Sequence, residues 1–204
     1  MMNSRRTKYS GFSLVELMVS MAITLVILGV AITVFSTAMG RRARESSRTD
    51  AITSAQAALN IMSREIGNAG YGLTNNGVVA DSTATTLHIR ANLINSNGTT
   101  SDPGEDIVFY LDGTGGDQSV VRRDNNTGEI SGIINRISSV NFAYQNYANP
   151  GEVVPVGVPG EATGRVTITL TVTLENVQGQ VAGQTVTVTS DVTLRNSAYM
   201  RGQY

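Results

Sequence analysis

Few residues in this sequence could carry out chemistry. It contains no Cys, which excludes disulfides, Cys-ligated zinc, iron–sulfur clusters and thiol catalysis. His88 is the only His, so a metal site with paired His ligands is excluded, and we expect His88 to be a satisfied or solvent-facing strand residue. No nucleophile motif is present, and the GTGG stretch at 113–116 lacks the Lys-Ser/Thr pair of a phosphate-binding loop. We therefore predict no catalytic residue, no metal and no cofactor.

Acidic residues in predicted turns are the remaining candidates for ligand binding. Clustered carboxylates can bind Ca²⁺, because this ion prefers oxygen ligands. The stretch DNNTGE does not fit an EF-hand, since its Gly128 falls one position early. We interpret these acids as solvated turn residues and keep a calcium-dependent binding module as an alternative. The candidates are Asp102, Glu105, Asp106, Asp112 and Asp117.

The most informative acid is Glu16, at the start of a long apolar segment. No charged residue occurs from Leu17 to Phe35, a run close to the roughly 20 residues with which a helix crosses a bilayer. An ionised carboxylate near hydrocarbon costs at least about 2.5 kcal/mol unless it finds a partner. Cleavage after Gly11 would make Phe12 the first residue, and its free amine on a neighbouring copy could reach Glu16 in a staggered bundle. Glu16 would then favour the assembled register.

Two simpler alternatives for this segment are a cleaved secretory signal and a generic membrane anchor. A secretory signal usually has an apolar core of about 7–15 residues, followed by a small-x-small cleavage site. Here the core is longer, and VFSTAMG offers no such site. Basic residues flank the span on both sides, so the charge count alone leaves its orientation open. The short leader and the export-like body favour a cytoplasmic N-terminus.

The stretch KYSGFSLVELMVSMAITLVILG, residues 8–29, resembles the class III signal of type IV prepilins and type II secretion pseudopilins. The shared features are a basic leader, Gly11 before the cut, Phe12 after it, Glu16 at the fifth mature position and a long apolar helix. The resemblance implies that prepilin peptidase cleaves between Gly11 and Phe12 and N-methylates Phe12. It also implies other pilin subunits and a pilus assembly platform as partners. Many major pilins have a proline midway along this helix, where the present sequence has only Gly29.

The helix is predicted to continue beyond the apolar segment, from Phe12 to about Asn68. Apolar residues recur at three- and four-residue steps, which predicts an amphipathic face on which a sheet packs. They are Ile52, Ala55, Leu59, Met62 and Ile66. A basic cluster precedes this face and is expected at the membrane interface or against acids of another subunit. Its members are Arg41, Arg42, Arg44 and Arg48.

The segment AQAALNIMSREIGNAGYG resembles the corresponding segment of PilW-like minor pilins and J-type pseudopilins. In those proteins an Arg-acid pair precedes AGYG. The matching residues here are Arg64, Glu65, Ala69, Gly70, Tyr71 and Gly72. The resemblance favours a minor subunit over a major pilin, but it separates a pilus from a secretion system less well.

The rest of the chain has the pattern of strands and turns. TLHIRANL predicts one strand, and EDIVFYLDGTGGDQSVVRRDNN predicts a hairpin of 107–111 with 119–123. A further strand is expected at 140–144. In RVTITLTVTLEN, Val, Ile and Leu alternate with Thr, which predicts one buried and one wet face. QTVTVTSDVTLRNS is expected to pair with it antiparallel, and the Pro- and Gly-rich region 148–164 is predicted to be a loop.

These observations predict an α+β, type IV pilin-like fold, with a long N-terminal helix packed on an antiparallel β-sheet domain. The expected divisions are a cleaved leader (1–11), a transmembrane and assembly half of the helix (12–40), an amphipathic half (41–72) and the globular domain (73–204). The expected function is that of a minor type IV pilin in pilus assembly or initiation, in a tip or priming complex with other minor pilins.

The expected location is the inner membrane, crossed once, with the C-terminal domain in the periplasm and later incorporation into a fibre. The alternatives are a J-type pseudopilin of a type II secretion system and a membrane-anchored adhesin or calcium-dependent module. The net charge of −1 indicates no nucleic-acid partner.

Overall fold

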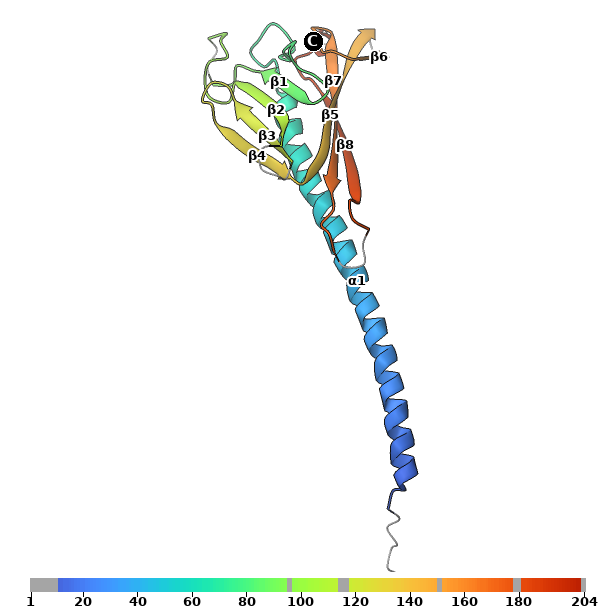
Figure 1. Cartoon of the computed structure of the whole chain (residues 1–204). Helices are drawn as coiled ribbons and strands as arrows, with labels where there is room; N and C mark the ends of the chain where they lie inside the picture. Colours follow the sequence, from blue (N-terminus) through green and yellow to red (C-terminus); the bar gives the residue numbers. More distant parts are fainter. Residues whose placement is uncertain (1–10, 95–96, 114–117, 150–151, 178–180, 203–204) are drawn as a thin grey trace, which may run out of the picture.

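One long helix, α1 (Leu14–Gly67), forms the spine of the molecule. The computed structural model describes residues 11–94, 97–113, 118–149, 152–177 and 181–202. With 54 residues, α1 is roughly 80 Å long at 1.5 Å per residue. Its first half projects alone and its second half enters a head of β-sheet, so the molecule is club-shaped (Figure 1). The prediction of a helix over 12–68 is confirmed within two residues at either end.

The described part of the head contains two antiparallel sheets, where a single sheet domain was expected. The first has the strand order β1-β2-β3-β4 and the second β6-β5-β7-β8. The strands are β1 (Thr86–Arg90), β2 (Asp106–Asp112), β3 (Ser119–Asp124), β4 (Ile130–Asn135), β5 (Ile137–Asn149), β6 (Glu152–Val156), β7 (Thr163–Thr173) and β8 (Thr185–Thr193). A one-turn helix, α2 (Ala198–Arg201), follows β8.

The two sheets diverge from the second half of α1, and both pack against the same face of this helix (Figure 1). The buried residues of this face are Ala55, Ala58, Leu59, Met62 and Ile66. The first sheet contributes Leu87 and Phe109 to the same core, and the second contributes Phe142, Tyr144 and Leu170. The predicted amphipathic face is therefore confirmed, although Ile52 is only half-buried at its lower end.

Several strand predictions are confirmed because alternation encodes them locally. β2 and β3 form the expected hairpin, and β7 and β8 pair antiparallel. In β7, Val166, Ile168, Leu170 and Val172 are buried, while the intervening Thr side chains are half-exposed. The segment before β7 was under-predicted: β5 runs for 13 residues, and β4 precedes it as a separate strand.

The prediction of a loop over 148–164 is wrong in part. β5 extends into this range, β6 lies within it, and β7 begins at Thr163. β6 contains Pro155, which is tolerated because β6 is an edge strand that pairs only with β5. A Pro in a sequence counts against a central strand but not against an edge strand, and this distinction was missed.

The two sheets join at Arg136, between β4 and β5. Its φ of 57° is the only positive value of a non-glycine residue in the described chain. This left-handed conformation turns the chain from the first sheet into the second within one residue. The Arg136 side chain forms an ion pair with Glu175 at 3.5 Å, beside the end of β7.

Candidate functional site

The foot of α1 contains the residues predicted for processing and assembly. Gly11 and Phe12 precede the helix, and Phe12 is 81% exposed. Ser13 is the N-cap, and its backbone N–H donates to Glu16 Oε2 at 3.4 Å. Ser-x-x-Glu is the sequence signature of a capping box, and an acid in the first turn also interacts favourably with the helix dipole.

This contact changes the expectation for Glu16. From the sequence we expected the amine of a neighbouring copy to be the partner of this carboxylate. The structure shows a long, weak one at the helix terminus, so the isolated chain compensates the charge in part. Cleavage after Gly11 and pairing of Glu16 with a second chain stay predictions.

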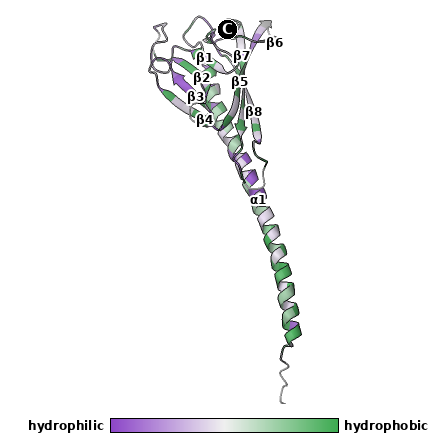
Figure 2. Ribbon diagram, in the orientation of Figure 1, coloured by the Kyte–Doolittle hydropathy of each residue, from purple (hydrophilic) through white to green (hydrophobic). Residues whose placement is uncertain are grey.

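The first half of α1 is apolar around its whole circumference and is fully exposed. It is long and apolar enough to cross a membrane, and none of its most apolar 18-residue window is buried in the head. Figure 2 shows this half in green, ending where the purple segment begins below the head. The helix passes through Gly29 without interruption.

Four hydroxyl groups within this apolar half, those of Ser20, Thr24, Thr33 and Thr37, donate hydrogen bonds inside the helix itself. Ser20 donates to the Leu17 carbonyl at 2.9 Å, and Thr24 donates to the Ser20 carbonyl at 2.8 Å. Thr37 donates in the same way to the carbonyl of Thr33, at 2.8 Å. Such back-bonding leaves no donor to be solvated, so these residues are compatible with hydrocarbon or with a bundle of helices.

The basic cluster follows directly above the apolar half. Arg41, Arg42 and Arg48 are exposed, and Arg44 is half-buried. The cluster therefore lies where the bare part of the helix meets the head, as expected for an interfacial band.

The AGYG segment forms a tight clamp at the upper end of α1. Gly70, Gly72 and Gly77 have φ values of 77°, 70° and 74°, which side chains rarely adopt. The Asn76 amide donates to the carbonyls of Gly160 and Thr163 at 2.8 and 2.9 Å, which ties this segment to the start of β7.

A second asparagine closes the clamp from the C-terminal side. The Asn196 amide donates to the Leu73 carbonyl at 3.2 Å, to the Asn75 carbonyl at 2.7 Å, and also to the Gly70 carbonyl. The two asparagines lie 120 positions apart, which is why the sequence gave no indication of their shared role.

The two residues of the Arg-acid pair before AGYG, Arg64 and Glu65, have different surroundings. Glu65 accepts from Arg122 Nε of β3 at 2.9 Å, which fixes the first sheet to the helix. Arg64 is exposed beside it. Glu65 therefore has a structural role, because its ion pair joins the first sheet to the helix.

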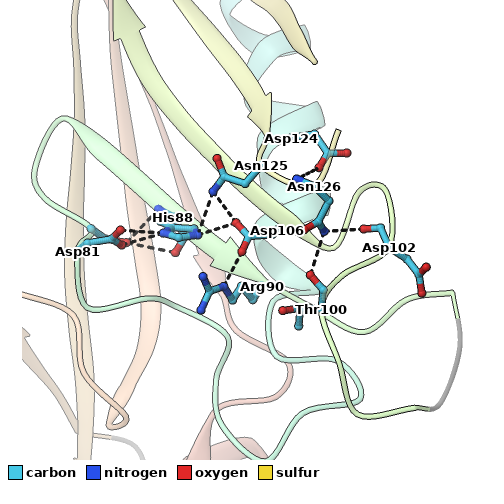
Figure 3. A network of polar contacts seen from close by, with 10 residues as sticks. Asp81, His88, Arg90, Thr100, Asp102, Asp106, Asp124, Asn125 and Asn126 are labelled. Carbon is cyan, nitrogen blue, oxygen red and sulfur yellow. Dashed lines mark hydrogen bonds and ion pairs between the residues drawn. The ribbon is translucent and has the colours of Figure 1, made fainter. Parts of the chain in front are cut away.

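His88 lies at the centre of a polar network between β1, β2 and the β3–β4 turn (Figure 3). Its Nδ1 is 2.8 Å from Asp81 Oδ1, and its Nε2 is 2.7 Å from Asp106 Oδ1. Each ring nitrogen therefore lies within hydrogen-bond distance of a carboxylate oxygen. The expectation of a satisfied strand histidine is confirmed, and the network explains why it is buried.

Asp106 is the buried acid of this network. Arg90 Nε donates to it at 2.7 Å and the Asn125 amide at 2.6 Å. Burial raises the pKa of Asp106. The hydrogen bonds from Arg90, Asn125 and His88 together lower it by more than burial raises it, so the net shift of the pKa is downward. Asp106 is therefore fully engaged by protein donors.

The other calcium candidates have structural partners as well. Glu105 is 1% exposed and accepts the backbone N–H groups of Leu93, Ile94 and Asp102 at 2.8, 3.0 and 3.1 Å. The hydrogen bond from Ile94 is the largest cause of its lowered pKa. In the described residues no group of acids and His is arranged to hold a metal ion. Asp117 lies outside the described residues.

Comparison with known proteins gives one match. Residues 6–32 match the prokaryotic N-terminal methylation motif. No curated protein and no solved structure matches the chain. The match covers Gly11, Phe12 and Glu16, together with most of the exposed apolar half of α1.

Proposed function

We propose that the chain, a type IV pilin-like subunit, acts as a minor pilin in pilus assembly or initiation, in a tip or priming complex with other minor pilins. The observation that carries the proposal is the exposed apolar half of α1. A bare apolar rod of this length is stable only in lipid or in a bundle of similar helices. Its attachment to a compact head suits a subunit that moves from one environment to the other.

Processing would prepare this subunit for assembly. The methylation motif implies processing by prepilin peptidase and assembly with other pilins. On our proposal the cut falls between Gly11 and Phe12, and Phe12 becomes N-methylated. Both residues are exposed and lie outside the helix, which supports access by a peptidase.

Glu16 would select the assembled state. Within its own chain the carboxylate meets only the Ser13 N–H, at 3.4 Å, among the described residues. A cationic amine at Phe12 of a neighbouring subunit is a stronger partner, because it adds direct charge–charge attraction in a low-dielectric environment, where such attraction is much larger than in water. The Glu16 carboxylate is thus partly stabilised in a single subunit and is stabilised more strongly when it pairs with a neighbouring subunit.

The proposed divisions follow the helix. Residues 1–11 form the leader, 12–40 the membrane and assembly half, 41–72 the amphipathic half, and 73–204 the head. The N-terminal apolar helix is consistent with an inner-membrane anchor. The proposed topology places the head in the periplasm. The pilin family is structural and not catalytic, so no enzyme activity is assigned.

Deletion of the gene tests the role directly. Loss of surface fibres with normal protein secretion would support the minor pilin. Loss of secreted exoproteins with normal fibres would instead indicate a J-type pseudopilin, and normal fibres with lost adhesion would indicate an adhesin.

Substitution of Glu16 tests the mechanism. We expect Glu16→Ala to be cleaved normally, as shown by intact-mass spectrometry, but to be at least tenfold depleted in sheared fibres. Glu45→Ala, which removes an exposed carboxylate of the same helix, is the matched control. Equal incorporation of the two variants would refute the role of Glu16, and a mature protein that begins at any residue other than Phe12 would refute the cleavage site.

A further inference from the structure

The two sheets have four edges, and three of them are protected. β1 is covered by residues 77–79, since Val79 N–H donates to the His88 carbonyl and Arg90 N–H to the Gly77 carbonyl. β4 is interrupted by a bulge opposite Val120 and Val121. β6 is five residues long and contains Pro155. Covering segments, bulges, short length and Pro are the devices by which proteins prevent an edge from pairing with another chain.

β8 has none of these protections within the described residues. It pairs with β7 alone, in an unbroken register of nine residues. Its sequence TVTVTSDVT contains no Pro, Gly or Lys and is rich in Thr and Val, the residues that favour strands. Nine residues at about 3.4 Å each make an open edge of roughly 30 Å.

The hydrogen-bond pattern shows which backbone groups of β8 face outward. Leu194 N–H donates to the Gly164 carbonyl, and Leu174 N–H to the Gln184 carbonyl. Both pairs lie in the register of β7 with β8, so hydrogen-bonded and non-hydrogen-bonded pairs alternate between them. The residues whose N–H and C=O groups point away from β7 are Thr185, Thr187, Thr189, Asp191 and Thr193.

The same five residues expose their side chains, while alternate residues face α1. Ser190 Oγ lies 3.2 Å from Ser63 Oγ, and Val192 packs against Gly67. The single charge of the strand, Asp191, accepts from Thr167 Oγ1 at 2.5 Å and lies 4.0 Å from Arg165. Arg165 offsets this charge in part, and the rest of the strand is uncharged, which suits an uncharged strand as its partner.

We propose that the outer edge of β8 accepts an extended strand from another pilin subunit, so that the second sheet continues across the subunit boundary. This inference rests on the proposed function and identifies one surface through which assembly occurs. Strand addition of this kind gains affinity from main-chain hydrogen bonds and specificity from alternate side chains. The incoming strand carries Ser, Thr or Val, because one of its faces extends the Thr surface and the other meets the serine-bearing flank of α1.

The membrane fixes the direction of this partner strand. β8 runs along α1 away from the apolar half, since Ser190 lies beside Ser63 and Arg195 N–H donates to the Gly67 carbonyl at the upper end of the helix. Two subunits anchored in one membrane stand with their helices parallel. An antiparallel partner for β8 is therefore a strand that runs toward the membrane in the neighbouring head.

A pair of variants at Thr189 isolates the outward N–H group. Thr189→Pro removes this group and the hydroxyl, whereas Thr189→Val removes the hydroxyl alone and keeps the N–H. Because the N–H does not bond β7, the ladder within the chain is preserved. We expect the full-length Val variant to enter sheared fibres like the wild type, and the Pro variant to be depleted about tenfold, with both variants melting near the wild-type temperature.

Amide exchange of the wild-type chain provides a second measurement that does not depend on folding of a variant. The amides of Thr187 and Thr189 should exchange rapidly in the detergent-solubilised chain and become at least tenfold slower in fibres. Equal exchange in both states, or equal incorporation of the Pro and Val variants, would overturn the strand-addition site and leave the minor-pilin role standing. Absence of the wild-type chain from every fibre would overturn the minor-pilin role itself.

Discussion

Two glycines with nearly the same backbone conformation should respond very differently to an added methyl group. Gly77 and Gly128 have φ values of 74° and 76°. For either residue, a left-handed alanine costs about 1–2 kcal/mol. At Gly128 nothing lies within 4 Å of an added Cβ, so this strain is the whole cost. We expect Gly128→Ala to lower the free energy of unfolding by about 1–2 kcal/mol.

The same methyl group at Gly77 would enter the clamp above α1. It would collide with the backbone nitrogen of Gly70 and the carbonyl oxygen of Arg90, and it would lie 2.7 Å from the Ala69 carbonyl carbon. Relief requires the hydrogen bonds from Gly70 to Arg90 (2.8 Å) and from Arg90 to Gly77 (2.7 Å) to open. If each opened bond leaves one buried group unpaired, at about 1–3 kcal/mol, Gly77→Ala should cost about 2–6 kcal/mol more than Gly128→Ala.

Urea unfolding of the full chain in mild detergent measures this difference. Six of the seven Tyr follow α1 in the sequence and the chain has no Trp, so tyrosine fluorescence and near-ultraviolet circular dichroism report mainly on the head, while the apolar half of α1 stays in the micelle. Failure of Gly77→Ala to fold would be the upper limit of the expected effect. Costs that agree within about 1 kcal/mol would refute the clamp, because strain alone would then account for both variants.

Two further changes test the core and the polar network. Met62→Ala should lower the free energy of unfolding by about 2–5 kcal/mol, since Met62 is completely buried, whereas Met18→Ala on the exposed apolar half should have no effect on urea unfolding of the head. The pKa of Asp106 is lowered in the folded chain from its ordinary value of 3.8, so its contribution is present above about pH 4 and is lost as pH falls through the folded pKa. Asp106→Asn should therefore lower the free energy of unfolding at pH 7 by about 1–3 kcal/mol. The melting temperature of this variant should also fall less than that of the wild type as the pH is lowered below about 4. An equal fall of the melting temperature in the two proteins would contradict this role of Asp106.

The sequence predicted most successfully those features that neighbouring residues encode. The apolar half of α1 is a contiguous run, and the buried face of its second half follows a helical period that ends at Ile66. The strict alternation in β7 likewise needs no knowledge of its partners. In each case the signal is periodic and local, so one chain suffices to detect it.

The features that were missed depend on residues far apart in the chain. His88 and Asp106 are separated by 18 positions, and Asn76 and Asn196 by 120, yet each pair acts as a unit. The division into two sheets depends on a left-handed turn at Arg136, a residue type that gives no sign of this conformation. One missed feature was local: Ser13 and Glu16 form the Ser-x-x-Glu signature, which was passed over because the acid was considered only in relation to lipid.

That capping contact affects the stability of a single subunit in the membrane relative to its stability in the assembled fibre. A carboxylate with no partner would make insertion costly, and one with an optimal internal partner would have little to gain from a neighbour. The contact from Ser13 N–H to Glu16 is long, at 3.4 Å, and its donor carries no net charge, so it offsets part of the cost and leaves the charge–charge attraction to a cationic amine. On the proposed function, weak capping at the foot of α1 and an open strand edge on the head are complementary. Each is tolerable in the solitary chain, and each is fully satisfied only by a neighbouring subunit.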